Sequence, residues 1–224
     1  MTDQDTLLDA IQMHVPFDGW SDAALKAACE DTGIPLETAR GIFPRGAVDI
    51  AFAYHKRGDR QMVDALQEMD LSMLKFREKV TAAVRKRLEV ADKECVRRGM
   101  SLFALPQHAA DGSKALWETA SLIWDTLGDT SRDVNWYTKR ATLSAVYSST
   151  VLYWLGDETE GNEATWAFLD RRIENVMQFE QVKGKLRSNA LVDAFMKGPG
   201  RVLDNIRAPG SHRTGYPGRW STNR

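Results

Sequence analysis

The feature that most constrains the fold of this 224-residue chain is the spacing of its apolar residues. They recur every three or four positions in nearly every segment, and the two-residue alternation typical of strands is absent. The chain is 43% hydrophobic and 27% charged, which is typical of a globular protein with a core of its own. We therefore expect an all-α protein of about eight to ten helices.

The N-terminal segment has a recognisable layout of short helices. We expect a first helix over 5–14, a second that begins at Ser21 and ends at Gly33, and a third over 34–43. Short helices joined by a glycine turn are typical of a helix-turn-helix module, and a long linking helix follows here as in TetR-type regulators. The predicted fold is thus a TetR-like helical bundle with a helix-turn-helix-like N-terminal subdomain.

The rest of the chain continues with longer helices. The pattern predicts helices over 47–68, 72–98, 112–127, 131–155, 162–187 and 189–206. The predicted domains are a helix-turn-helix-like subdomain at 1–45, a helical bundle at 46–187, an amphipathic helix at 188–207 and a basic tail at 208–224. The tail is polar and rich in Pro and Gly, so we expect it to be disordered.

Charge is distributed unevenly along the chain. Residues 1–70 hold 6 Lys and Arg against 13 Asp and Glu, whereas residues 171–224 hold 11 against 4. DNA affinity depends on neutralising phosphates with basic side chains. The third helix offers Arg40 with Glu37 beside it, inside the acidic segment. We therefore expect no nucleic-acid binding, and any anionic partner should meet the C-terminal end.

No catalytic signature stands out. The four histidines are scattered, none follows a glutamate at the Glu-x-x-His spacing of di-iron bundles, and no nucleotide-binding or nucleophile motif is present. Cys29 and Cys95 lie far apart, without zinc-ligand spacing. We expect no enzyme activity, no metal and no cofactor. The acidic N-terminus argues against a signal or transit peptide, so we expect a bacterial-type cytosolic chain or a mature organelle one.

Segment 133–155 is apolar on two sides. At 100° per residue, Trp136, Leu143, Tyr147 and Trp154 share one side, and Ala141, Ala145, Ser148 and Leu152 lie opposite. It is either a central helix buried all round or a helix whose small-residue face lines a ligand cavity. Because Lys139 and Arg140 keep its start near water, we expect Trp136 or Tyr137 to be partly exposed, as in a protein-interaction hot spot.

The helix expected over 189–206 is amphipathic and basic. Its apolar stripe and positive charges are typical of a membrane-surface element, although docking on its own domain is an alternative. The Gly-Pro-Gly run at 198–200 should kink or loosen it. The candidate membrane-binding residues are Val192, Phe195, Met196, Lys197, Arg201, Leu203 and Ile206.

Three segments, IFPRGAVDI, GDTSRDVNWYTKRATLSAVYSSTVLYWL and TWAFLDRRIENVM, together resemble the coenzyme Q (ubiquinone) biosynthesis accessory family of the Coq-nine type. The resemblance covers about residues 5–206. It implies a TetR-like, dimeric, non-enzymatic protein that binds isoprenoid or quinone lipid in an interior pocket. It also implies contact with the membrane surface and with a di-iron demethoxyubiquinone hydroxylase.

Carried onto this chain, the family's hydroxylase-contact patch falls on Trp136 and Tyr137, with Ile123 nearby and Arg140 as the second basic residue of the motif. If helix 131–155 forms a wall of the lipid pocket, the contact residues are Ala141, Leu143, Ala145, Tyr147, Ser148 and Leu152. With no targeting extension expected, the resemblance implies a bacterial-type member, cytoplasmic and peripheral to the inner membrane.

Two other functions remain alternatives at this point. One is a ligand-responsive transcriptional repressor of the TetR type. The other is an enzyme that acts directly on quinone precursors.

Overall fold

The computed structural model describes residues 2–187 and 208 of the chain. The described chain is all helix, with no strand: α1 (Asp3–Asp18), α2 (Asp22–Thr32), α3 (Leu36–Ile42), α4 (Ala47–Gln67), α5 (Phe76–Glu89), α6 (Lys93–Phe103), α7 (Ala109–Thr126), α8 (Val134–Leu155), the short 3-10 helix η1 (Glu160–Asn162) and α9 (Glu163–Arg187). Helix α1 is longer than predicted, and α9 begins within one residue of its predicted start. The helix predicted over 189–206 lies outside the described residues.

Side-chain caps set where several helices begin. Ser21 accepts a hydrogen bond from Ala24 N at the start of α2, as predicted, and Gly33 ends that helix in the left-handed conformation. Asp92 accepts from Cys95 N and starts α6, so the single helix predicted over 72–98 is in fact two. The helix predicted from residue 131 begins at Val134, because Asp133 is its N-cap and accepts a hydrogen bond from Asn135 N.

Helix α4 runs without a break through Gly58. A Cβ atom at this position would lie 2.7 Å from Nη1 of Arg87. The glycine therefore serves the close approach of a buried arginine on α5.

Two hydrophobic clusters hold the helices together. The first joins α1–α3 to the N-terminal half of α4 and to Cys95 of α6, with Leu7, Leu8, Ile11 and Phe43 at its centre. The second fills the bundle of α4, α5, α7, α8 and α9, around residues such as Met62, Leu88, Ile123 and Leu169. Each fully buried apolar side chain contributes about 1.5–3 kcal/mol before ordering costs.

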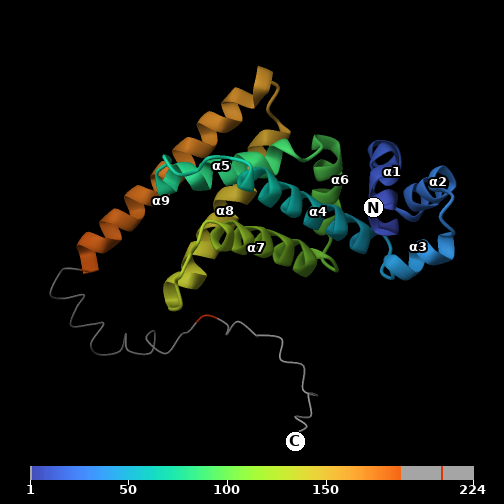
Figure 1. Ribbon diagram of the computed structural model, residues 1–224, viewed down its shortest axis with the longest axis horizontal. Coiled ribbons are helices and arrows are strands. Elements are labelled where there is room, and N and C mark those ends of the chain that lie inside the picture. Colours follow the sequence, from blue (N-terminus) through green and yellow to red (C-terminus); the bar gives the residue numbers. More distant parts are fainter. Residues whose placement is uncertain (1, 188–207, 209–224) are drawn as a thin grey trace, which may run out of the picture.

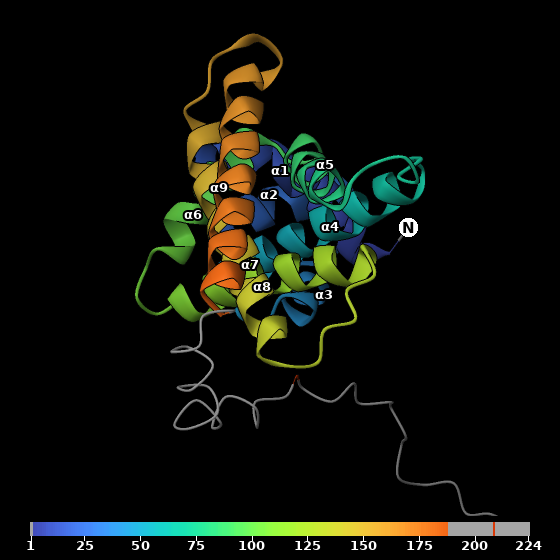
Figure 2. The ribbon, with the colours of Figure 1, turned by 90° about the vertical axis from the view of Figure 1, so that its left-hand side faces the viewer.

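The arrangement in space follows from these two clusters. In Figure 1, α1–α3 gather at one end, α4 runs from them into the bundle, and α9 crosses the far end. Figure 2 looks onto that far end, where α9 lies in front. Helix α4 thus links both clusters, and α6 lies beside the place where they meet. The predicted boundary between residues 45 and 46 stays a prediction, since α4 and α6 contribute to the first cluster as well.

Candidate functional site

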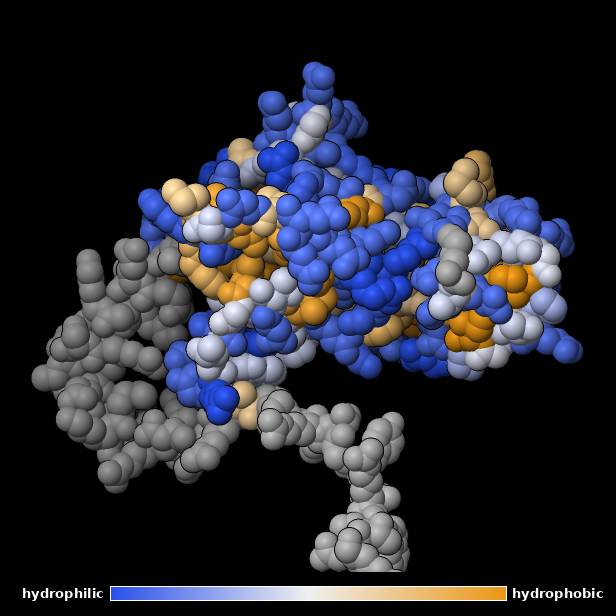
Figure 3. Space-filling model, in the orientation of Figure 1, coloured by the Kyte–Doolittle hydropathy of each residue, from blue (hydrophilic) through white to orange (hydrophobic). Residues whose placement is uncertain are grey.

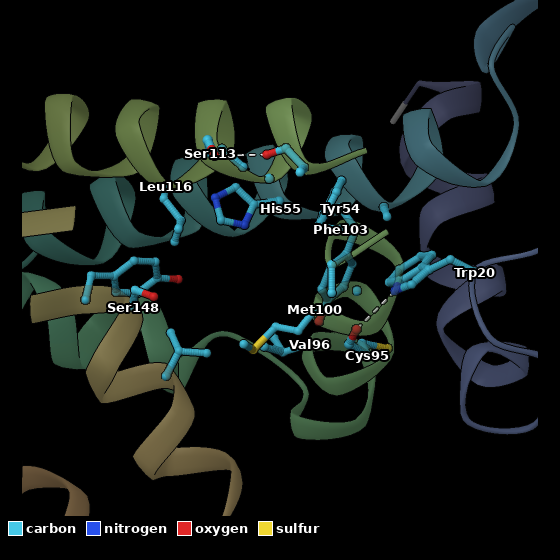
Figure 4. Close-up of a pocket in the computed structure, with 18 of the residues that line it drawn as sticks. Trp20, Tyr54, His55, Cys95, Val96, Met100, Phe103, Ser113, Leu116 and Ser148 are labelled. Atoms are coloured by element: carbon cyan, nitrogen blue, oxygen red, sulfur yellow. Dashed lines mark hydrogen bonds between the residues drawn. The ribbon is translucent and has the colours of Figure 1, made fainter. Parts of the chain in front are cut away.

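A cavity of about 370 Å³ lies where the two clusters meet. Helices α4, α6, α7 and α8 form its walls, Trp20 closes the N-terminal end, and Arg87 of α5 reaches it. Figure 4 shows Trp20 and Ser148 at opposite ends, with His55 and Leu116 on one side and Val96 and Met100 on the other. The volume is at the low end of the roughly 300–1,000 Å³ typical of small-molecule sites.

Most of the cavity lining is apolar or small. Val96, Met100, Phe103, Leu116 and Val151 supply the larger apolar side chains. Helices α6 and α7 can approach because residue 112 is glycine: a Cβ atom there would lie 2.8 Å from Cβ of Phe103. Such a surface favours an apolar ligand, because the transfer of apolar surface out of water into an apolar site is favourable.

One wall of the cavity is polar and tightly bonded. His55 Nε2 lies 2.7 Å from Thr119 Oγ1, and that hydroxyl donates to Asp59 Oδ1 at 2.8 Å. Arg87 donates from Nε to the same Asp59 oxygen at 2.8 Å and from Nη2 to the His55 carbonyl at 2.9 Å. Asp59 is 1% exposed and Arg87 3%, so the pair is a buried salt bridge.

Burial determines the protonation states along this wall. Desolvation, reinforced by the nearby Arg87 charge, lowers the pKa of His55 to about 4, so its ring is neutral at neutral pH. Burial also raises the pKa of Tyr147, whose phenol therefore stays protonated. His55, Arg87 and Tyr147 thus line the cavity, and Asp59 lies behind this lining as the buried counter-ion of Arg87.

Helix α8 meets the cavity with a different face from the predicted one. Tyr147 and Ser148 line the cavity, as predicted. Ala141, Ala145 and Leu152 are exposed on the outer side, and Leu143 is buried in the second cluster without lining the cavity. These four residues are therefore not placed for contact with a ligand in this cavity.

The other lining residues come from separate segments that the sequence did not bring together. Trp20, His55 and Arg87 belong to three different stretches of the chain, and Met100 and Phe103 belong to a fourth, α6. One signal was available: Arg87 stands between Val84 and Leu88 on the apolar stripe of its helix. A charged residue on a buried stripe needs a partner, and it marks a functional or structural polar site.

An aromatic surface lies at the start of α8, with Trp117 of α7 beside Trp136 and Tyr137. Trp136 is T-shaped against Tyr137 at 4.8 Å between centroids, and Trp117 lies 5.9 Å from Trp136. All three are half-buried, so the predicted partial exposure of Trp136 and Tyr137 is confirmed. Apolar side chains also gather over the α5, α8 and α9 end of the face in Figure 3.

Two residues of the predicted partner patch are interior. Ile123 and Arg140 are both 0% exposed. Arg140 donates to Asp125 at 2.6 Å and to Asp129 at 3.1 Å, and its guanidinium lies 4.0 Å from the Trp136 ring centroid. Neither residue presents a contact surface in this chain. Arg140 instead positions Trp136 from beneath.

The described residues hold no group of three or more His, Cys, Asp or Glu side chains arranged for a metal ion. No helix within the described part of the chain is long and apolar enough to cross a membrane. The candidate membrane residues Val192, Phe195, Met196, Lys197, Arg201, Leu203 and Ile206 all lie outside the described residues. Ala208, which is described, donates its N–H to the carbonyl of Arg132 at 3.0 Å, next to the start of α8.

The helices and the cavity define a class of fold. A TetR transcriptional regulator from Nitrosomonas europaea has a similar structure, with a TM-score of 0.63 over 76% of this chain and 95% of that one, at 17% identity. The predicted all-α, TetR-like fold is thereby confirmed. At this identity the likeness concerns the fold alone.

Sequence relatives then narrow the class to a family. Residues 109–180 match the COQ9 family. The chain is 32% identical to the mitochondrial ubiquinone biosynthesis protein COQ9 of Drosophila melanogaster over 79% of this chain and 56% of that protein. It is 28% identical to COQ9-A of Xenopus laevis over 91% of this chain and 67% of that protein. These matches confirm the resemblance to the coenzyme Q biosynthesis accessory family, and the chain is a relative of COQ9 that spans roughly half to two thirds of these proteins.

The same relatives correct the expected location. The Drosophila, Xenopus and human proteins are all named mitochondrial. The prediction of a bacterial-type member, cytoplasmic and peripheral to the inner membrane, is therefore wrong. It relied on the acidic N-terminal residues, which do not report the compartment.

Proposed function

We propose that this chain is a non-catalytic, lipid-binding accessory protein of ubiquinone biosynthesis. In this role it binds isoprenoid quinone intermediates at the membrane and presents them to a di-iron demethoxyubiquinone hydroxylase. The likeness to proteins named for ubiquinone biosynthesis supports the general role. The finer parts, which are lipid binding, the hydroxylase partner and the membrane contact, are the proposal.

The cavity is the observation that carries the proposal. It is apolar over most of its wall, has one polar side and lies between α4, α6, α7 and α8. A prenylated quinone has the matching chemistry, with an apolar tail and a ring that bears oxygens. Because its tail is too apolar to leave the bilayer unaided, a protein that covers apolar surface lowers the cost of moving the ring toward a soluble-facing site.

The aromatic surface supports the partner side of the proposal. Trp117, Trp136 and Tyr137 expose part of their rings next to charged residues, a composition typical of interaction hot spots. A second copy of the chain and a membrane are the other proposed partners, with the membrane contact expected from residues 189–206.

The experiment that tests the proposal is to purify the chain under mild conditions and identify its bound lipid by mass spectrometry after denaturation. We expect quinones or other isoprenoid lipids in near-stoichiometric amount. A chain that stays free of lipid, even after incubation with quinone-loaded vesicles, would overturn the lipid-binding role.

The fold favours one other function, a ligand-responsive repressor, because a TetR regulator shares it. The charge opposes that reading: residues 1–70 carry 13 Asp and Glu against 6 Lys and Arg, so phosphates would be repelled. A salt-dependent, sequence-dependent DNA mobility shift would support the repressor and count against the accessory role.

A further inference from the structure

The Tyr147 hydroxyl is a polar group that the described protein leaves without a partner. Tyr147 lines the cavity and is 4% exposed, and no described residue forms a hydrogen bond with its oxygen. The Tyr147 oxygen is not one of the described buried atoms that lack a partner, which are Asp59 Oδ2 and Arg140 Nε, so it faces the space of the cavity, where a ligand can reach it. Burial keeps the phenol protonated, and it can therefore donate to an acceptor oxygen.

The charges next to the cavity are already balanced. Arg87 is neutralised by Asp59 at 2.8 Å, and Lys56, 3.6 Å from Asp59, also pairs with Glu118 at 3.3 Å. Asp59 Oδ2 is buried with no hydrogen bond. An added anion would find no free cation here and would be repelled by Asp59. Burying an unpaired charge is costly.

The cavity size limits what can enter. A volume of about 370 Å³ suits a substituted ring and a short length of tail, not a long polyprenyl chain. The ring and the tail of a prenylated ligand therefore have different surroundings, with the ring inside and most of the tail beyond the opening.

We propose that the cavity selects an uncharged, oxygen-bearing ring, with Tyr147 donating a hydrogen bond to a ring oxygen, and that it discriminates against carboxylated or phosphorylated ligands. The choice of a quinone as that ring rests on the proposed function. The selectivity follows from the unpartnered hydroxyl, the balanced salt bridge and the volume. Ser148, adjacent on α8, lines the same end of the cavity.

The test compares three ligands with tails of two isoprene units: a ubiquinone analogue, a prenylated hydroxybenzoate and the isoprenoid hydrocarbon without a ring. Binding to the full chain is measured by calorimetry at neutral pH, where the benzoate is ionised. We expect the quinone to bind tightest and the benzoate about tenfold or more weakly. Equal binding of all three would overturn the selectivity while leaving lipid binding intact, and no binding by any would overturn both.

A matched pair of variants isolates the hydroxyl. Tyr147→Phe keeps the ring and removes the donor, so quinone affinity should fall about three- to tenfold while hydrocarbon affinity stays unchanged. Tyr153→Phe is the control, because Tyr153 is on the same helix but outside the cavity lining. Unchanged quinone affinity in Tyr147→Phe, or an equal loss in both variants, would overturn the role of Tyr147.

Discussion

Arg87 and Arg140 are both buried cations, but their carboxylate partners differ in how far they are buried. Arg87 pairs with an equally buried Asp59 at the edge of the cavity. Arg140 pairs with buried Asp129 and with Asp125, whose side chain is 61% exposed. Removing one partner of a buried pair typically costs about 3–5 kcal/mol, because the other charge is left uncompensated. These arginines therefore restrict which substitutions the neighbouring positions tolerate.

At the residue scale, His55 should make stability depend on pH. Its pKa is about 4 in the folded chain and about 6.5 when unfolded, so between these values the unfolded state binds more protons. Stability should therefore fall as pH drops from about 6.5 to about 4. With the side chain 17% exposed, the loss should not exceed about 3 kcal/mol. Urea unfolding at steps between pH 7 and pH 4.5 measures it.

The control for this prediction is His55→Gln, which keeps a polar side chain near Thr119 but does not titrate. We expect the variant to lose most of the pH dependence in this window. The pKa of Asp129 is lowered to about 2, where its hydrogen bonds with Lys139, Ser131 and Arg140 outweigh burial, so its contribution is lost only below about pH 4. The same slope in wild type and variant would show that another group titrates.

At the element scale, α8 shows what helical periodicity can and cannot determine. The pattern correctly predicted a helix with two apolar sides, and it indicated partial exposure at Trp136 and Tyr137. It assigned the ligand to the small-residue face, which instead points outward at Ala141 and Ala145. The rotation of a helix about its axis depends on the neighbours it packs against, which for α8 are chiefly α7 and α9, and the period of the sequence does not place those neighbours.

A substitution pair on α8 tests which face meets the ligand. Ser148→Phe adds a ring inside the cavity and should reduce quinone affinity about tenfold or more, since the site at about 370 Å³ has little spare room. Ala145→Phe, three residues earlier on the outer face, should leave affinity unchanged. Bound lipid quantified by mass spectrometry in both purified variants is the measurement. A larger loss in Ala145→Phe would move the ligand to the outer face.

At the scale of the whole molecule, the helical class and the TetR-like layout were predictable because they depend on local spacing and turn residues. The cavity was not, because it is assembled from Trp20, α4, α5, α6, α7 and α8. Of the residues assigned to the ligand, only Tyr147 and Ser148 line it. Sequence spacing along one helix carries no information about which distant segments complete a wall.

The aromatic surface gives a prediction at the same scale. Trp136→Ala should weaken association with the proposed hydroxylase about tenfold or more, as expected for an aromatic hot spot. A charged replacement such as lysine is avoided, because it would place a second cation close to Arg140, whose guanidinium lies 4.0 Å from the centroid of the Trp136 ring. Surface-immobilised binding of the purified hydroxylase gives the affinity.

The control replaces another exposed aromatic residue at the opposite end of the molecule. Phe17 on α1 is 84% exposed, so Phe17→Ala should leave hydroxylase affinity unchanged. Both variants should keep the far-ultraviolet circular dichroism of the parent. If Trp136→Ala binds as tightly as Phe17→Ala, the hydroxylase contacts another surface.

The position of the cavity between the two hydrophobic clusters has a consequence for how the chain unfolds. A ligand held between Trp20 and Tyr147 touches the N-terminal unit and the bundle together. Binding to the folded state alone stabilises it by about 2.7 kcal/mol at a ligand concentration one hundred times Kd. That free energy is shared by both clusters, so the filled chain should melt in a single cooperative transition. The acidic N-terminal unit then closes one end of the ligand site through Trp20, a use for a helix-turn-helix layout that requires no DNA.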